Sequence, residues 1–153
     1  MEKRKGGFTI IELIVVMTII LILAGLISGA AQKAKQQAMV AKARSMIAGL
    51  ETALGMFQAD VGIYPVNGNL HSNLTSSTGL TTVQAANWAG PYMNFQTNEV
   101  SGTDILDPWS SPYHYANTGG AAHGFDHYID IYSNGPDKAD NSGAGDDITN
   151  WRR

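Results

Sequence analysis

Glu12 is the only ionisable residue in an apolar run that extends from Phe8 to Ala31. A carboxylate at the centre of a membrane helix costs about 2.5 to 3.5 kcal/mol by insertion scales, so a compensating partner is expected. A cut between Gly7 and Phe8 would create one, because a free α-amino group titrates near pH ~8 and is largely cationic at neutral pH. The amine would lie one helical turn from its own Glu12, or against Glu12 of a neighbouring chain. These residues therefore predict charge pairing after cleavage.

A second group of chemically capable side chains lies near the C-terminus. Segment 133–151 places Asp137, Asp140, Asp146 and Asp147 among glycine and asparagine residues. Carboxylates crowded in one loop repel each other unless a cation compensates them. Calcium is the natural candidate because it binds about six to eight oxygens, whereas zinc and copper favour thiols and imidazoles. The loop lacks the EF-hand ligand order, and on composition alone an acidic, glycine-rich loop is more often simply solvated.

The histidines form neither a catalytic set nor a metal set. His123 and His127 are four residues apart, but they lie in a predicted loop-to-strand segment where that spacing does not bring two imidazoles to one ligand. His71 and His114 stand alone in the sequence, so surface or structural roles are expected for all of these residues. No nucleophile elbow, S-x-x-K or P-loop pattern is present. The sequence therefore does not predict an enzyme.

Charge and cysteine content narrow the class of protein further. The formal net charge is −3, and the first seven residues carry three basic residues and one acidic residue, so their removal leaves −5. An acidic chain is a poor candidate for binding nucleic acid, which usually requires a basic patch. The chain contains no cysteine, so something other than a disulfide must tie down the loops of an exported domain of this size.

A long N-terminal helix is expected to position Glu12. Residues 8–31 are apolar over a length that can cross a bilayer, since about 20 helical residues match the hydrocarbon core. The basic residues within segment 1–7 should stay on the cytoplasmic side. The helix should continue as an amphipathic segment over residues 32–62, because apolar residues recur there at three- and four-residue spacing. These residues are Ala43, Met46, Ile47, Leu50, Leu54 and Phe57.

The remaining residues, 63–153, are expected to form a small globular domain. Pro65 ends the helix, and the segment from Val66 to Asn87 indicates a loop with a short helix around Thr81 to Trp88. Alternating residues near Tyr113 to Tyr115 and from His127 to Tyr132 predict two antiparallel strands joined by a glycine-rich hairpin loop at Asn117 to Gly124. Of the alternating residues in the second strand, Ile129 and Ile131 should face one side, and Tyr128, Asp130 and Tyr132 the other. The tryptophans are expected to be packing residues.

The start of the chain resembles a known family signal. The sequence KGGFTIIEL, from Lys5 to Leu13, is similar to the class III signal and mature start of type IV pilins and type II secretion pseudopilins. The resemblance implies that a membrane-embedded prepilin peptidase cuts between Gly7 and Phe8 and methylates the Phe8 amine, and that Glu12 assists docking into a helical filament. Two other interpretations remain open: an ordinary secretory signal cleaved near Ala30, and a plain single-span anchor.

The far end of the chain resembles one branch of that family. The motifs YP at Tyr64, DPW at Asp107, DIYSNGPD at Asp130 and DDITNW at Asp146 occur in the order found in major pseudopilins of type II secretion. The resemblance implies a calcium ion held by a ligand set drawn from the C-terminal loop. That set consists of the side chains of Asp137, Asp146 and Asp147 and the backbone carbonyl of Asn134. The loop is longer than the usual family spacing, which leaves Asp140 as a substitute ligand.

The resemblance implies an α+β, type IV pilin-like fold with a calcium-tied C-terminal loop. The expected function is that of a non-enzymatic subunit of the periplasmic pseudopilus, which drives export of folded proteins through the outer membrane. Its implied partners are copies of itself, minor pseudopilins, the prepilin peptidase, the inner-membrane assembly platform and, before assembly, the membrane itself. The alternatives are a type IV pilin of a surface fibre and, from another class, a membrane-anchored periplasmic binding domain. Relatives commonly carry proline where Gly29 stands, so the usual helix kink cannot be assumed.

Overall fold

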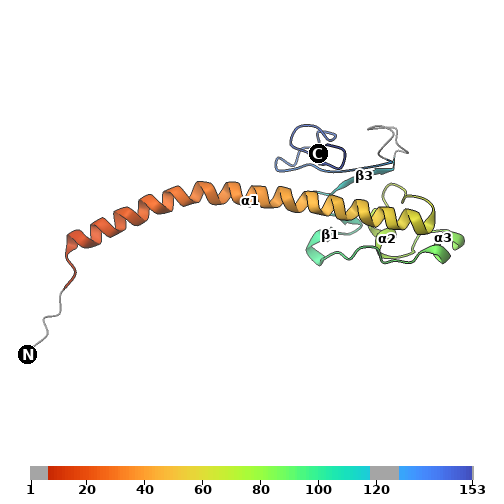
Figure 1. The fold of residues 1–153 in the computed structure, drawn as a ribbon, viewed down its shortest axis with the longest axis horizontal. Helices are drawn as coiled ribbons and strands as arrows, with labels where there is room; N and C mark the ends of the chain where they lie inside the picture. The colour runs from red at the N-terminus through yellow and green to blue at the C-terminus, as the bar shows by residue number, and fades with distance from the viewer. Residues whose placement is uncertain (1–6, 118–127, 153) are drawn as a thin grey trace, which may run out of the picture. The chain divides into compact units, whose positions relative to one another are not determined.

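The structure, a computed structural model, describes residues 7–117 and 128–152. The chain divides into two compact units at the boundary between Gln37 and Ala38. The helices, in chain order, are α1 (Ile10–Val61), α2 (Leu70–Thr75), α3 (Thr82–Asn87) and the 3-10 helix η1 (Thr97–Glu99) (Figure 1). The strands are β1 (Val100–Ser101), β2 (Asp104–Ile105), β3 (His114–Asn117), β4 (Ile129–Ser133) and β5 (Ile148–Thr149).

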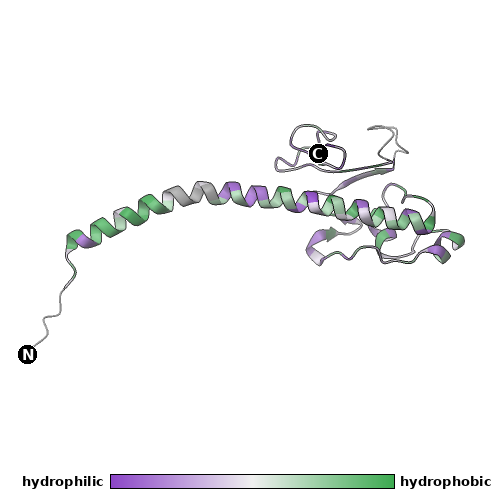
Figure 2. Cartoon of the chain, viewed as in Figure 1, coloured by the Kyte–Doolittle hydropathy of each residue, from purple (hydrophilic) through white to green (hydrophobic). Residues whose placement is uncertain are grey.

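The first unit consists of the first part of α1 and the residues ahead of it. Hydrophobic residues dominate this part of the helix (Figure 2), and their side chains are exposed from Phe8, at 84%, to Leu23, at 52%. Among the residues that the structure describes, no helix offers a stretch both long and apolar enough to cross a membrane. The backbone of α1 is helical through Gly29, so no break occurs at that glycine.

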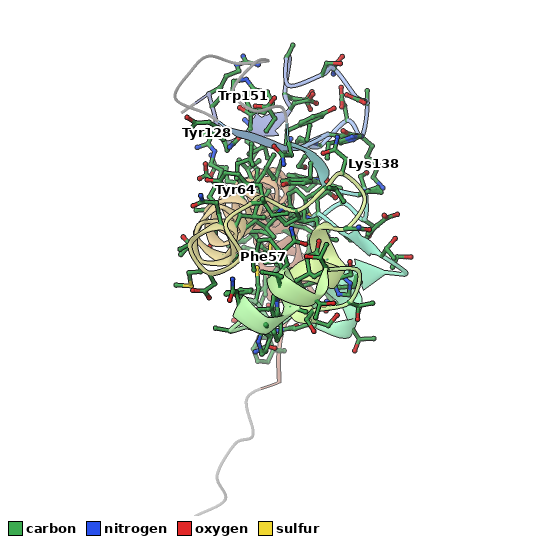
Figure 3. The ribbon with its side chains drawn as sticks, turned by 90° about the vertical axis from the view of Figure 1, so that its right-hand side faces the viewer. Phe57, Tyr64, Tyr128, Lys138 and Trp151 are labelled. Carbon is green, nitrogen blue, oxygen red and sulfur yellow. The ribbon has the colours of Figure 1, made fainter. Side chains whose placement is uncertain are left out.

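The second part of α1 supplies the spine of the hydrophobic core in the second unit. The predicted apolar stripe is confirmed, because Ala43, Ile47, Leu50, Leu54 and Phe57 are all buried and Met46 packs against them. Phe57 lies in the interior (Figure 3). Full burial of each large apolar side chain favours folding by about 1.5 to 3 kcal/mol. The stripe is therefore the largest single contribution of α1 to the stability of this unit.

The end of α1 follows the expected chemistry. Gly62 has a φ of +85°, the left-handed conformation that glycine adopts without a steric cost. Its N–H donates to the carbonyl of Gln58 at 2.9 Å, which satisfies one of the last helical acceptors. Tyr64 and the buried Pro65 then lead the chain away from the helix axis.

The strands form two small antiparallel sheets. One pairs β1 with β2, and the other has the order β3-β4-β5. In the second sheet His114 lies opposite Tyr132, and Ser133 lies opposite Ile148. The expected antiparallel pair of strands is thereby confirmed as β3 and β4. The hairpin loop predicted between them falls mostly outside the described residues, as do His123 and His127.

Three features differ from the sequence prediction. Helix α2 lies in the segment expected to be a loop, where Leu70 and Leu74 are buried in the core. Strands β1, β2 and β5 were not predicted, because two-residue strands carry no periodic signal. Burial along β4 does not alternate: Asp130 is buried as well as Ile129 and Ile131, so the two predicted faces of this strand are not one buried and one exposed face. The short helix α3 was predicted, and a capping box between Thr81 and Gln84 stabilises its start.

Candidate functional site

The acidic C-terminal loop is held closed by the strands at its two ends. Strand β4 ends at Ser133 and β5 begins at Ile148, and these two residues pair in register. The antiparallel pairing brings together the two ends of the segment that carries the predicted metal ligands. The loop therefore starts and finishes on one sheet, and its interior has to satisfy its own polar groups.

The backbones of Gly135 and Asp146 lie in close contact within the loop. A side-chain carbon added to Gly135 would overlap the carbonyl oxygen of Asp146, and the φ of Gly135 is +68°. Both facts require glycine at this position. The residues next to this contact in the sequence, Asn134 and Asp147, are each only 9% exposed. The contact thus brings two predicted ligand positions into the same part of the loop.

Asp147 is the most constrained carboxylate of the loop. Its Oδ2 atom accepts hydrogen bonds from the N–H groups of Gly143 at 2.7 Å and Asn141 at 3.1 Å. Its Oδ1 atom is buried and has no hydrogen-bond partner among the residues that the structure describes. A buried carboxylate oxygen without a partner is costly. The carboxylate is therefore half satisfied by the loop backbone and half available for a ligand.

The other acidic side chains of the loop are exposed and bind backbone groups. Asp146 Oδ2 accepts from the N–H of Asp137 at 3.2 Å, and Asp137 Oδ1 accepts from the N–H of Ala139 at 2.8 Å. Asp140 Oδ1 accepts from Ser142 N–H at 2.8 Å. That hydrogen bond is the main reason why the pKa of Asp140 lies below its usual value. Asp137 and Asp146 are thus neighbours, whereas Asp140 is already engaged elsewhere.

A buried network that the sequence did not predict supports the start of the loop. The hydroxyl of Ser133 donates to Asp107 Oδ2 at 2.6 Å and accepts from the N–H of Gly135 at 3.1 Å. Asp107 Oδ1 accepts from the N–H groups of Trp109 at 2.9 Å and Ser111 at 2.8 Å. Asp107 is 5% exposed and Ser133 is fully buried. One carboxylate therefore fixes both the turn at Asp107 and the turn at Gly135.

Asn150 performs the corresponding role at the end of the loop. Its Oδ1 atom accepts from the N–H of Ile131 at 3.0 Å, and its Nδ2 atom donates to the carbonyl of Ile129 at 3.0 Å. The same Nδ2 atom donates to Glu51 Oε1 on α1 at 3.1 Å. Trp151, expected from the sequence to be a packing residue, packs edge-on against the ring of Tyr132. The side chains of Asn150 and Trp151 thus fasten the loop end to the fold.

The donor set suits a cation that binds oxygen. Within residues 7–117 and 128–152, no group of at least three histidine, cysteine, aspartate or glutamate side chains converges as a metal centre. Among the described residues, Asp147 Oδ1 and Asn134 Oδ1 are buried without a hydrogen-bond partner, whereas Asp130 has other interactions. A carboxylate, an amide and backbone carbonyls are ligands that calcium combines. The two unpartnered side-chain oxygens of the loop are therefore of the kind that calcium binds.

At the N-terminus, Glu12 has a local partner that the sequence analysis did not identify. Its Oε2 atom accepts from the N–H of Thr9 at 2.9 Å and from the Thr9 hydroxyl at 2.8 Å. The Thr9 hydroxyl in turn accepts from the N–H of Glu12 at 3.3 Å. This reciprocal pair is a capping box at the start of α1, and the T-x-x-E spacing could have predicted it. The Glu12 carboxylate consequently points toward the predicted cleavage point.

The residues around the predicted cleavage point are accessible. Phe8 is 84% exposed, and Gly7 has open space where a side chain would stand. Phe8, Ile11, Val15 and Val16 line a shallow apolar pocket together with Glu12.

Both histidines whose positions are described pack on aromatic rings, His71 on Phe95 and His114 on Tyr132. These histidines have the structural roles that the sequence analysis expected.

Comparisons with known proteins match both ends of the chain. The sequence model described as "Type II secretion system (T2SS), protein G" matches residues 30–151, and that of the "Prokaryotic N-terminal methylation motif" matches residues 3–28. The type II secretion system core protein G of Klebsiella pneumoniae is 33% identical over 97% of this chain and 96% of its own length. The corresponding protein of Escherichia coli (strain K12) is 34% identical over 97% of this chain and 92% of its own length.

A solved structure agrees with these sequence matches. It is the crystal structure of the major pseudopilin from the type 2 secretion system of enterohaemorrhagic Escherichia coli. The alignment covers 80% of this chain and 94% of that chain, with 27% sequence identity and a TM-score of 0.51. The α+β fold predicted from the sequence, a long N-terminal helix with a small antiparallel sheet, is confirmed.

The network around Asp107 predicts a large loss of stability on substitution. Asp107→Ala removes a buried acceptor of three hydrogen bonds, and bonds to charged groups contribute about 1.5 to 3 kcal/mol each, not additively. We expect a decrease of about 2 to 4 kcal/mol in the free energy of unfolding, measured by urea denaturation. The exposed Asp104 provides a matched control, and Asp104→Ala should change stability by less than about 0.5 kcal/mol. Equal effects of the two substitutions would contradict the role assigned to Asp107.

Proposed function

The chain belongs to the protein G family of the type II secretion system, and on this basis we propose how its two ends serve a filament. It is a structural subunit of the pseudopilus, the function carried by the family match together with the fold of a major pseudopilin. The family is one of structural subunits rather than enzymes. Self-polymerisation follows from that role, and the finer steps of processing, assembly and loop closure are argued below.

The N-terminal segment is processed before assembly. We propose that a prepilin peptidase cuts between Gly7 and Phe8 and methylates the new amine of Phe8. The match of the methylation motif to residues 3–28 supports this step, as does the exposure of Phe8. After cleavage the amine lies one residue from Thr9, whose N–H already binds Glu12. The Glu12 carboxylate would then attract the amine of its own chain or that of a neighbouring copy, since opposite charges in an apolar filament core interact strongly.

The exposed apolar side chains of the first part of α1 must be shielded from water both before and after assembly. We propose that segment 8–31 first lies in the inner membrane, with residues 63–153 in the periplasm and the basic leader on the cytoplasmic side. The apolar run in the sequence and the exposed side chains from Phe8 to Leu23 support this proposal. In the pseudopilus, copies of the same segment would cover one another. The inner-membrane assembly platform and the minor pseudopilins are the further partners of this scheme.

A type IV pilin of a surface fibre is the alternative that shares the N-terminus. Relatives that match over almost the whole chain are secretion proteins, which favours the pseudopilus. A membrane-anchored periplasmic binding domain is less well supported, because the family model and the relatives reported above are those of secretion proteins. Periplasmic protein export is therefore the process in which the chain is proposed to act.

We propose that calcium completes the C-terminal loop. The side chains of Asp137, Asp146 and Asp147 and the backbone carbonyl of Asn134 would hold it, with Asp140 as a substitute. The unpartnered Oδ1 atom of Asp147 supports this assignment, whereas the hydrogen bond from Ser142 to Asp140 makes that carboxylate the least available. A bound divalent cation would neutralise the carboxylates and reduce the conformational entropy of the open loop.

Intact-mass and peptide analysis of the protein purified from its native host tests the processing step. We expect a mature chain that begins at a methylated Phe8. Gly7→Val should block the cut, whereas Gly6→Ala, a neighbouring substitution in the leader, should leave it intact. An uncut wild-type chain, or one cut near Ala30, would contradict the pilin-type assignment.

Removal of calcium tests the loop. We expect EDTA to lower the Tm of the wild-type chain by several degrees, because about 1 kcal/mol corresponds to roughly 2 to 8 °C in domains of this size range. Asp147→Ala should abolish most of the difference between the Tm in calcium and the Tm in EDTA.

The exposed Lys138 lies in the same loop and provides a control, since Lys138→Ala should keep the calcium-dependent difference in Tm. If the wild-type chain melts at the same temperature in EDTA and in excess calcium, the loop does not depend on the metal.

A further inference from the structure

We propose that the side-chain amide oxygen of Asn134 is a direct ligand of the cation in the C-terminal loop. The inference rests on the proposed calcium site, and it adds a neutral side-chain donor at a position to which the family resemblance assigns only a backbone carbonyl. It predicts a role for the identity of the Asn134 side chain, which a carbonyl ligand alone would not require.

The first observation is the state of the Asn134 side chain. The residue is 9% exposed, and its Oδ1 atom is buried without a hydrogen-bond partner among the described residues. Buried amide oxygens in folded proteins are almost always hydrogen-bonded, because an unsatisfied polar atom is destabilising. An asparagine is unfavourable at a buried position that provides no hydrogen-bond donor for its amide oxygen. Calcium commonly binds the amide oxygens of asparagine, so a cation removes this contradiction.

The second observation is where the two flanking residues hold Asn134. Ser133 is fixed by its 2.6 Å hydrogen bond to Asp107, and Gly135 lies against the carbonyl of Asp146. The backbone of Asn134 is therefore held on both sides, and its side chain is buried.

The third observation is a second unpartnered oxygen close by in the loop. Asp147 follows Asp146 directly, and its Oδ1 atom is also buried without a partner in the described part of the chain. Asn134 and Asp147, which flank the contact between Gly135 and Asp146, thus each carry one side-chain oxygen without a hydrogen-bond partner. Two such oxygens in one loop are explained together by a single cation.

The chemistry of an amide suits this position. Asp137, Asp146 and Asp147 already supply negative charge, and each additional carboxylate would increase their mutual repulsion when the cation is absent. An amide oxygen adds a ligand without adding charge. The side chain of Asn134 would therefore raise the number of oxygen donors while limiting the electrostatic cost of the empty loop.

Calcium titration of the full chain in detergent, monitored by calorimetry after EDTA treatment and dialysis, tests the inference. Asn134→Leu keeps the backbone carbonyl and the approximate side-chain volume but removes the amide oxygen. We expect this substitution to raise the calcium Kd by at least about tenfold, because even the loss of an outer-sphere partner typically reduces metal affinity by that much. In EDTA its Tm should equal or exceed that of the wild type, because a buried unsatisfied polar group has been removed.

Two further variants complete the experiment. Asn134→Asp should bind calcium more tightly than the wild type and melt at a lower temperature in EDTA, since it adds a charge to the empty loop. Asn141→Ala keeps the backbone N–H that binds Asp147 and should retain wild-type affinity. A wild-type affinity in Asn134→Leu, or a Tm in EDTA lowered as much as the Tm in calcium, would overturn the inference alone. Failure of the wild-type chain to bind calcium would overturn the calcium proposal as well.

Discussion

The backbone contact between Gly135 and Asp146 is the constraint on which the C-terminal part of the structure depends. No residue other than glycine fits there, because a side-chain carbon would overlap the Asp146 carbonyl and because φ is positive. The contact packs the two sides of the loop against each other, and the residues beside it, Asn134 and Asp147, are buried. Asp147 is thereby held in a buried position, whereas Asp137, Asp140 and Asp146 stay exposed. The chain contains no cysteine, so no disulfide ties this loop down.

The contact is supported from both directions by buried polar groups. Asp107 orders the approach to Gly135 through Ser133, and Asn150 fastens the segment after Asp146 to β4 and to Glu51 on α1. The loop conformation is consequently linked to the helix whose apolar stripe forms the core of the same unit. In a filament subunit, this linkage would keep the exposed loop in one shape on the helix that carries it. The N-terminal end works differently, because among the described residues Glu12 hydrogen-bonds with Thr9, its neighbour in a capping box.

The elements with strong periodicity could be predicted from the sequence. Helix α1, its buried stripe and its end at Gly62 followed from apolar spacing and from glycine and proline chemistry, and β3 and β4 followed from alternation. Helix α2 and the two-residue strands could not be predicted, because their formation depends on tertiary contacts rather than on local pattern. The T-x-x-E spacing of Thr9 and Glu12 could have predicted the capping box, whereas the apolar surroundings of Glu12 in the sequence predicted a charged partner.

The candidate site, like the fold, could be predicted from the sequence only in part. Composition and motif spacing located the acidic loop, and Asp147 proved to be its buried carboxylate. The supporting residues Asp107, Ser133 and Asn150 were not identified as such, because hydrogen bonds between residues far apart in the sequence leave no local signature. The ligand set proposed for the loop depends on which side-chain oxygens remain unpartnered after folding. That property becomes visible only when the hydrogen bonds of the loop are known.

The most direct measurement is a crystal structure of the chain grown in calcium, with anomalous scattering used to locate the ion. We expect one anomalous peak in the C-terminal loop, within about 2.3 to 2.6 Å of Asp147 Oδ1 and of an oxygen of Asn134. A loop with no such peak, in which water or protein groups hydrogen-bond to Asp147 Oδ1, would contradict the central claim that a cation closes it.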